Sequence, residues 1–188
     1  KLHQKLGVTT IYVTHDQVEA MTLGSRVAVM ENGFLRQLGR PRDVYDNPSN
    51  KFVAGFVGTP PSNFVPAALA SDGVPALDVA GQRVQLSQSQ QRAAASVPAG
   101  SYVWGIRPED LLVDGQSNLP EVAAAFPTTI SFVEMMGSET FIHANVADTT
   151  VVVRASSAFE YAQGDPVRLV VNVARTHLFH ADSGEAIF

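Results

Sequence analysis

Apolar and polar positions follow two different periods along this chain of 188 residues, and the period changes near residue 60. In the first part, apolar side chains recur at helical spacing, as in Phe52, Val53, Phe56 and Val57. In the second part, short runs alternate apolar with polar residues, which is typical of strands with one buried face. The pattern therefore predicts two parts of different structure.

The first part begins with a predicted helix, strand and helix. "KLHQKLG" (1–7) has leucines one helical turn apart before a glycine, and "VTTIYVT" (8–14) is β-branched and apolar on both faces. Asp16 and Glu19 have the spacing of a capping box for the second helix. This order is the repeating unit of a doubly wound α/β fold, in which ligands lie at the carboxyl ends of strands, the position of His15.

Three further elements complete the first part. Asn32-Gly33 between "RVAVM" and "FLRQLG" predicts a β-hairpin, because this dipeptide suits the tight turns that join paired strands. Pro41 opens a short helix that is expected to run to Asp46. Ser49 is expected to cap another helix within "NKFVAGFVG".

The second part is predicted to be all-β. Residues 59–64 contain adjacent prolines and predict a stiff linker. Beyond them, short strand-like runs separated by turn residues favour a small barrel or sandwich. These runs are "VPALDVAG", "QRVQLS", "SYVWGI", "PTTISFVEMM", "TFIHANV", "TTVVVRA" and "PVRLVVNVA". "QSQQRAAAS" is expected to form a polar loop or a short helix.

Composition excludes several classes of protein. The chain has no cysteine, so it forms neither a disulfide scaffold nor a thiolate metal site. Its longest apolar run, residues 122–126, is far shorter than the roughly 20 residues that span a bilayer. No apolar secretory signal follows Lys1, and because the chain lacks an initiator methionine we expect it to be a piece of a longer protein.

Charge is divided unevenly between the two parts. Residues 1–64 carry seven Lys or Arg against five Asp or Glu, whereas residues 65–188 carry six against thirteen, a net charge of −7. Such an acidic part repels phosphate backbones, so nucleic acid is not an expected partner.

Few side chains outside this pattern suggest chemistry. His177 and His180 are expected on a strand and its turn, where they would not chelate a metal, so no metal site is predicted. Trp104, the single tryptophan, is expected in the core. Residues 107–110 are expected to form a salt-bridged turn rather than a binding site, and His15 by itself is more often a structural residue than a chemical one.

Linked motifs give His15 more weight. "THDQVEAM" (14–21), the Asn-Gly hairpin, "RDVYDNP" (42–48) and "FVAGFVG" (52–58) follow one another at fixed spacing. In this order they resemble the final third of the nucleotide-binding domain of ATP-binding subunits of ABC importers, of the maltose type that serves sugars, polyols and glycerol phosphate. Later residues resemble the regulatory OB-like (transport-associated) domain of those subunits, in "NFVPAAL", "WGIRPEDL", "VEMMGSETFIH" and "THLFHADSGEAIF".

The resemblance implies a domain organisation. Residues 1–58 would be an α/β fragment, the last part of a P-loop ATPase domain, and 59–64 a linker. Residues 65–188 would be an all-β OB-like barrel domain for regulation and dimerisation.

The resemblance also implies a role for His15. It stands where the family has its switch histidine, which hydrogen-bonds the γ-phosphate of ATP and helps to hold the attacking water. Asp16 is expected to cap the following helix, and Thr14 and Gln17 to be local structure. ATP and Mg²⁺ are therefore the expected cofactors of the complete protein.

The other motifs of an ATP site are absent from this sequence. None of its three lysines follows a glycine, so it has no P-loop. It also contains neither an Asp-Glu dipeptide nor the Leu-Ser-Gly-Gly-Gln signature. This chain alone is therefore expected to bind no cofactor and to be inactive, while the complete parent is expected to be an ATPase.

Two hypotheses about partners remain open. As part of an importer subunit, the protein would form a homodimer through the OB-like domain and work with transmembrane permease subunits and a solute-binding protein. It would then lie in the cytoplasm, on the inner face of the membrane. Alternatively, it could be a free-standing OB-type module that binds oligonucleotide or a small oxyanion, which salt-dependent binding of labelled oligonucleotide would reveal.

Overall fold

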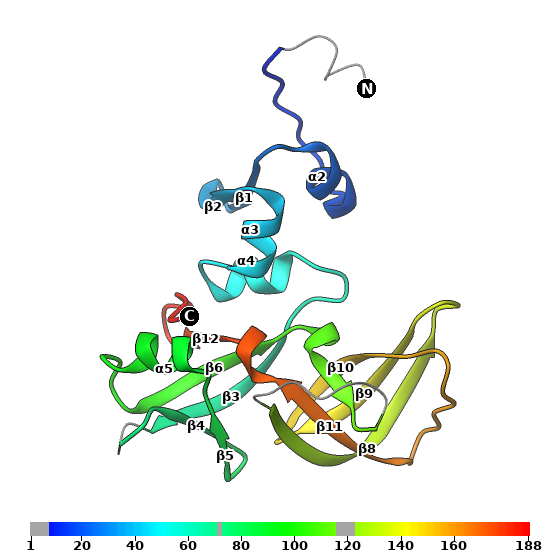
Figure 1. Cartoon of the computed structure of the whole chain (residues 1–188). Coiled ribbons are helices and arrows are strands. Elements are labelled where there is room, and N and C mark those ends of the chain that lie inside the picture. Colours follow the sequence, from blue (N-terminus) through cyan, green and yellow to red (C-terminus); the bar gives the residue numbers. More distant parts are fainter. Residues whose placement is uncertain (1–7, 71–72, 116–122) are drawn as a thin grey trace.

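The computed structural model describes residues 8–70, 73–115 and 123–188. Within them, short helices and one hairpin form an N-terminal part, which lies above two antiparallel sheets that form the OB-like part (Figure 1). The fold class is thus confirmed as a small α/β part followed by an all-β part. No helix in the described ranges has the length and apolar character needed to cross a membrane.

Helix α2 (Gln17–Leu23) begins where its capping residue predicts. The Asp16 carboxylate accepts hydrogen bonds from the backbone N–H groups of Val18 at 2.8 Å and Glu19 at 3.1 Å. The reciprocal half of the predicted capping box is wrong, because the Glu19 carboxylate instead accepts a hydrogen bond from the Thr14 hydroxyl at 2.7 Å. The cap is therefore a simple aspartate cap.

The predicted hairpin is confirmed. Strands β1 (Val27–Glu31) and β2 (Phe34–Gly39) pair antiparallel, and the turn residues Asn32 and Gly33 have φ angles of 50° and 84°. Only such left-handed turn residues match the twist of paired strands in a two-residue connection, which is why Asn-Gly is found there.

Two short helices follow the hairpin. Helix α3 (Pro41–Asp46) is confirmed, and α4 (Lys51–Phe56) forms as expected but with a different cap. The Asn50 side chain, not Ser49, accepts the hydrogen bond from the backbone N–H of Val53 at 3.0 Å. These elements enclose a small apolar core of Val29, Val44, Val53 and Val57.

The strand predicted at residues 8–14 is wrong. These residues form no described strand pairing, and the side chains of Ile11 and Val13 are 91% and 86% exposed. A strand that is buried on both faces needs neighbouring strands and covering helices, and none lies beside this segment in the described chain. The helix predicted at residues 1–7 lies outside the described residues.

The first sheet of the OB-like part has the strand order β12-β6-β3-β4-β5. Every neighbouring pair is antiparallel. Its strands are β3 (Asn63–Ala70), β4 (Ala76–Val79), β5 (Gln82–Gln85), β6 (Gly100–Ile106) and β12 (His177–His180). Helix α5 (Gln88–Ala94) lies between β5 and β6 in the sequence, so the short-helix alternative for this segment is the one observed.

The second sheet has the order β10-β9-β8-β11-β7. It too is antiparallel throughout. Its strands are β7 (Leu111–Val113), β8 (Ala123–Met135), β9 (Thr140–Val146), β10 (Thr149–Ala155) and β11 (Pro166–Asn172). Short 3-10 helices η1 (Pro108–Asp110) and η2 (Val173–Arg175) connect the two sheets. Each predicted run therefore contains a strand, and β3, β7 and β12 complete the sheets.

The two sheets share one apolar core. Trp104, Ile106, Leu169 and Leu178 all have no solvent exposure within it, so the prediction of Trp104 as a core residue is confirmed. Asn63, expected in the linker, is instead the first residue of β3. Its side-chain amide exchanges two hydrogen bonds with the backbone of Val152 on β10, at 2.8 and 2.7 Å.

The C-terminal residues return to the N-terminal part. The backbone N–H of Lys51, at the start of α4, donates to the carbonyl of Gly184 at 2.7 Å. The N–H of Ala186 donates to the carbonyl of Ser49 at 3.0 Å. These bonds seat α4 on the first sheet, where Figure 1 shows it next to the C-terminus.

Candidate functional site at the junction of the two parts

His15 lies at an exposed bend immediately before helix α2. Its imidazole forms no hydrogen bond or ion pair with any part of the chain that the structure describes. The neighbouring Asp16 carboxylate is directed into the helix as its cap. The imidazole is therefore available to a ligand outside the chain, while its backbone is held by the capped helix that follows.

Gln17 joins this segment to the start of the connection between the parts. Its side-chain nitrogen donates to the carbonyl of Phe56 at 2.6 Å, and its side-chain oxygen accepts from the backbone N–H of Gly58 at 2.8 Å. The expectation that Gln17 serves only local structure is wrong, because both partners lie about forty positions away. No local pattern in the sequence marks this pairing.

Arg107 holds the same connection from the other side. It is only 3% exposed, and its guanidinium donates to the carbonyls of Val57 at 2.8 Å and Tyr45 at 2.6 Å. The guanidinium carbon also lies 3.6 Å from the centre of the Tyr45 ring, a cation–π contact. Burial lowers the pKa of Arg107 from its ordinary value, but an arginine remains charged at neutral pH.

Tyr45 extends this cluster to the turn after β6. Its hydroxyl donates a hydrogen bond to the Glu109 carboxylate. Burial and this bond raise the pKa of Tyr45 to about 12, so the hydroxyl keeps its proton at neutral pH. The salt bridge predicted within residues 107–110 is wrong, because Asp110 pairs instead with Arg175, outside the turn, at 2.9 Å. Arg107, however, binds backbone carbonyls of the N-terminal part, so the turn fastens the two parts together.

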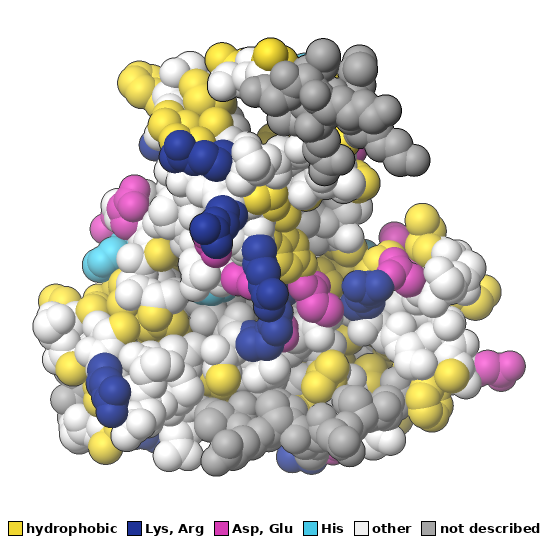
Figure 2. Space-filling model, turned by 45° about the horizontal axis from the view of Figure 1, so that its top comes forward, with side chains coloured by type: hydrophobic (Ala, Val, Ile, Leu, Met, Phe, Trp, Pro, Cys, Tyr) yellow, Lys and Arg dark blue, Asp and Glu magenta, His cyan; other side chains and the backbone are white. Residues whose placement is uncertain are grey.

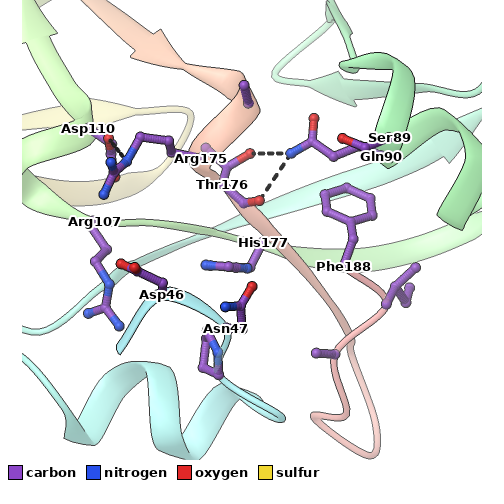
Figure 3. A pocket seen from close by; sticks show the side chains of 14 residues that line it. Asp46, Asn47, Ser89, Gln90, Arg107, Asp110, Arg175, Thr176, His177 and Phe188 are labelled. Atoms are coloured by element: carbon purple, nitrogen blue, oxygen red, sulfur yellow. Dashed lines mark hydrogen bonds and ion pairs between the residues drawn. The ribbon is translucent and has the colours of Figure 1, made fainter. Parts of the chain in front are cut away.

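A cavity of about 550 Å³ opens beside this cluster (Figure 3). Asp46 and Asn47 line it from the end of α3, and Gln90 lines it from α5. Arg175 and His177 line it from the segment that enters β12. The side-chain nitrogen of Gln90 is occupied by the carbonyls of Val173 at 2.7 Å and Thr176 at 3.1 Å, which fixes the wall of the cavity.

The pKa values of two side chains in the cavity wall are shifted in opposite directions. Burial raises the pKa of Asp110 to about 6, against the attraction of Arg175. Burial and the positive charge of Arg107 lower the pKa of His177 to about 4. At neutral pH Asp110 is therefore ionised and His177 is neutral, because both pKa values lie below 7 and both groups are deprotonated.

These displacements predict opposite pH dependences. The folded state favours protonated Asp110, so the contribution of this group to the stability of the protein falls as the pH rises from about 4 to 6. The folded state disfavours protonated His177, so the contribution of this group to the stability of the protein falls as the pH falls from about 6.5 to 4. Each slope amounts to about 3 kcal/mol over its window, and the two largely cancel.

Two variants separate these slopes. The stability of His177→Gln is expected to fall as the pH rises from 4 to 6, and that of Asp110→Asn to fall as the pH drops over the same range. Urea denaturation at several pH values measures both. Parallel curves for the two variants and the unmutated protein would contradict the prediction.

The histidines of β12 form no metal site. His177 lies in the cavity wall, while His180, three residues along the strand, is exposed and lies against the Tyr102 ring at 5.6 Å between ring centres. Over the described ranges, no group of three or more His, Cys, Asp or Glu side chains is arranged to hold a metal ion.

Family models match most of the OB-like part. Residues 58–111 match the MalK OB fold domain, and residues 104–179 match the TOBE domain. The overlap of the two matches contains Arg107 and the turn that it opens.

Whole-length relatives extend this similarity to the N-terminal part. The chain is 41% identical to the trehalose/maltose import ATP-binding protein MalK of Thermococcus litoralis, covering 100% of this chain and 51% of that protein. It is 38% identical to the osmoprotective compounds uptake ATP-binding protein GgtA of Synechocystis sp., covering 100% and 51%. It is 35% identical to the sn-glycerol-3-phosphate import ATP-binding protein UgpC 1 of Rhizobium johnstonii, covering 100% and 48%.

The chain therefore spans about half the length of the curated relatives it matches. Its matches run from the N-terminal part with His15, through residues 56–58, to the end of the OB-like part. The chain therefore carries the MalK OB fold and TOBE domains, and it belongs to the family of ATP-binding subunits of ABC importers.

Proposed function

We propose that this chain is the C-terminal part of the ATP-hydrolysing subunit of an ABC importer that energises uptake of a carbohydrate-like solute. The observation that carries the proposal is the alignment of the entire chain, at 35–41% identity, with import ATP-binding proteins. The relatives' names include trehalose/maltose and sn-glycerol-3-phosphate, so the solute class is stated only as carbohydrate-like.

In the complete subunit, His15 contacts the γ-phosphate of ATP. Its exposed imidazole has no partner in the described chain and suits this role, because a ring N–H can donate to a phosphate oxygen. A P-loop lysine and an Asp-Glu pair, both absent from this sequence, would hold the rest of the nucleotide and its Mg²⁺. When bound, Mg²⁺ neutralises phosphate charge, and His15 orients the terminal phosphate and the attacking water.

The N-terminal part has a surface suited to further protein. Apolar side chains are exposed on it, and Figure 2 shows several together at its outer end. Among the exposed apolar side chains of the N-terminal part are Ile11, Val13, Leu23, Phe34 and Leu35. Exposed apolar groups gathered on one side of a small unit are typical of an interface. In the proposal, this surface packs on the remainder of the ATPase domain.

The OB-like part pairs two subunits and regulates them. Apolar side chains near the β8–β9 turn support a contact with a second copy, since Met135 and Met136 are 84% and 65% exposed. The permease subunits and the solute-binding protein are the other proposed partners. They would place the subunit at the cytoplasmic face of the membrane.

The described residues of the OB-like part do not favour binding of nucleic acid. Five of the six arginines in residues 65–188 are occupied: Arg107 is buried, Arg154, Arg168 and Arg175 each pair with a carboxylate, and Arg83 donates to the carbonyl of Val74. On the face in Figure 2, cationic and acidic side chains lie next to each other instead of forming a basic groove.

The complete subunit tests the proposal. Assembled with its permease in vesicles, it is expected to hydrolyse ATP faster when solute and binding protein are supplied, and alone it is expected to sediment as a dimer. Met135→Asp is expected to shift the mass toward monomer, whereas Val74→Asp, at a site 58% exposed elsewhere in the OB-like part, is not. Solute-independent turnover, or a monomer at every concentration, would contradict the respective half of the proposal.

A further inference from the structure

Three consecutive residues between the two parts are held by side chains from both parts. The carbonyl of Phe56 and the N–H of Gly58 bind the Gln17 amide, at 2.6 and 2.8 Å. Between them, the carbonyl of Val57 accepts from Arg107 at 2.8 Å. The backbone of residues 56–58 is therefore fixed to helix α2 on one side and to the turn after β6 on the other.

The Gln17 contact controls orientation as well as distance. A planar amide that donates to one residue and accepts from another two positions away permits little rotation of either segment. Helix α2 has no fully buried residue, and Met21 packs only partly buried against the small apolar core. Gln17 is the first residue of that helix and lies two positions after His15.

Gly58 is needed for the close approach of Arg107. Its φ angle of 122° is one that side chains rarely adopt, and a Cβ there would lie 3.0 Å from the Arg107 guanidinium. The same glycine donates to Gln17. Gly58 thus lies in contact with both side chains, Gln17 and Arg107, that hold this segment.

We propose that Gln17 is a positioning residue that couples His15 to the OB-like part through residues 56–58 and Arg107. This rests on the proposed role of His15 in ATP hydrolysis. A displacement of the OB-like part changes the placement of residues 56–58, and the Gln17 amide transmits that change to the segment that carries His15. Regulation through the OB-like part therefore acts on the rate of hydrolysis rather than on nucleotide affinity.

The chain contains a matched control for this residue. The Gln37 amide makes the same two kinds of bond, donating to the carbonyl of Asn47 at 2.9 Å and accepting from the N–H of Ser49 at 2.8 Å. All of its partners lie inside the N-terminal part. The same substitution at Gln37 therefore perturbs an equivalent bridge that contacts neither residues 56–58 nor Arg107.

The test uses the complete subunit assembled with its permease. Gln17→Glu keeps the acceptor for Gly58 but places a carboxylate against the Phe56 carbonyl, a repulsive contact. We expect kcat for ATP to fall about tenfold while KM for ATP changes less than about twofold, since only the transition state needs His15 in place. Gln37→Glu is expected to leave both constants unchanged.

Two further variants distinguish failure of the coupling from failure of the role proposed for His15. If His15→Ala lowers turnover but Gln17→Glu does not, the coupling is overturned and the proposed function stands. If His15→Ala leaves turnover intact, the role proposed for His15 in ATP hydrolysis itself fails. A double-mutant cycle with Arg107→Lys is expected to be non-additive, because both residues act through the same three residues.

Hydrogen exchange provides a readout that does not depend on Gln17→Glu folding normally. In Arg107→Lys, the amides of Val18 and Glu19 are expected to exchange about tenfold faster, although Arg107 touches neither residue. Gln37→Glu is expected to leave them unchanged. Unaltered exchange at α2 in Arg107→Lys would overturn the coupling.

Discussion

Replacing His15 with alanine in the complete subunit is expected to lower steady-state ATP hydrolysis by about a hundredfold or more. The imidazole is the single group of the motif that is exposed and unpartnered in the described chain, so its loss removes a contact to the phosphate and not a structural bond. Nucleotide binding is expected to persist, because the P-loop supplies most of that energy elsewhere in the complete subunit. Single-turnover hydrolysis and binding of labelled ATP separate the two effects.

His180→Ala is the matched control for this prediction. His180 is also exposed, but it lies at the end of β12, on the first sheet of the OB-like part. Its replacement is expected to leave turnover unchanged, and neither variant is expected to lower the melting temperature appreciably. Turnover of His15→Ala near the unmutated rate would refute the role assigned to His15.

The second large effect is expected on stability. Arg107→Met removes both hydrogen bonds to the N-terminal part and leaves the carbonyls of Tyr45 and Val57 without their donors. An unpaired buried carbonyl costs about 1–3 kcal/mol, so the free energy of unfolding is expected to fall by about 2–5 kcal/mol. Methionine also loses the cation–π contact with the Tyr45 ring, so the measured loss includes this contact as well as the hydrogen bonds.

Arg154→Met provides the comparison. Arg154 pairs with Glu139 at the surface, and its side chain is half exposed. Exposed ion pairs contribute about 1 kcal/mol or less, so this variant is expected to unfold at nearly the same urea concentration as the unmutated protein. Equal losses for the two variants would show that Arg107 does not fasten the junction.

Elements whose signals are local were predicted correctly from the sequence. Asp16 caps α2 because its carboxylate reaches N–H groups two and three residues ahead, and Asn32-Gly33 turns the hairpin because it accepts left-handed backbone angles. The β character of the second part also followed from short alternating runs. In each case, the deciding contacts lie within a few residues.

Predictions that depended on neighbours in space were less successful. Residues 8–14 have the composition of a buried strand, but burial is a property of what lies beside a segment, and nothing covers this one in the described chain. Ser49 was a reasonable cap by residue type. The Ser49 hydroxyl instead donates to the carbonyl of Arg36 at 3.2 Å, and Asn50 caps α4.

The sequence by itself indicated the two-part organisation and the family, because these depend on residue order and local periodicity, whereas the role of His15 stays a prediction. Only the tertiary structure decided what Gln17 and Arg107 do. Their partners lie 39 to 62 positions away and are mostly backbone atoms, which carry no residue-specific signal. The junction therefore exists only once the chain has folded and brought these distant segments into contact.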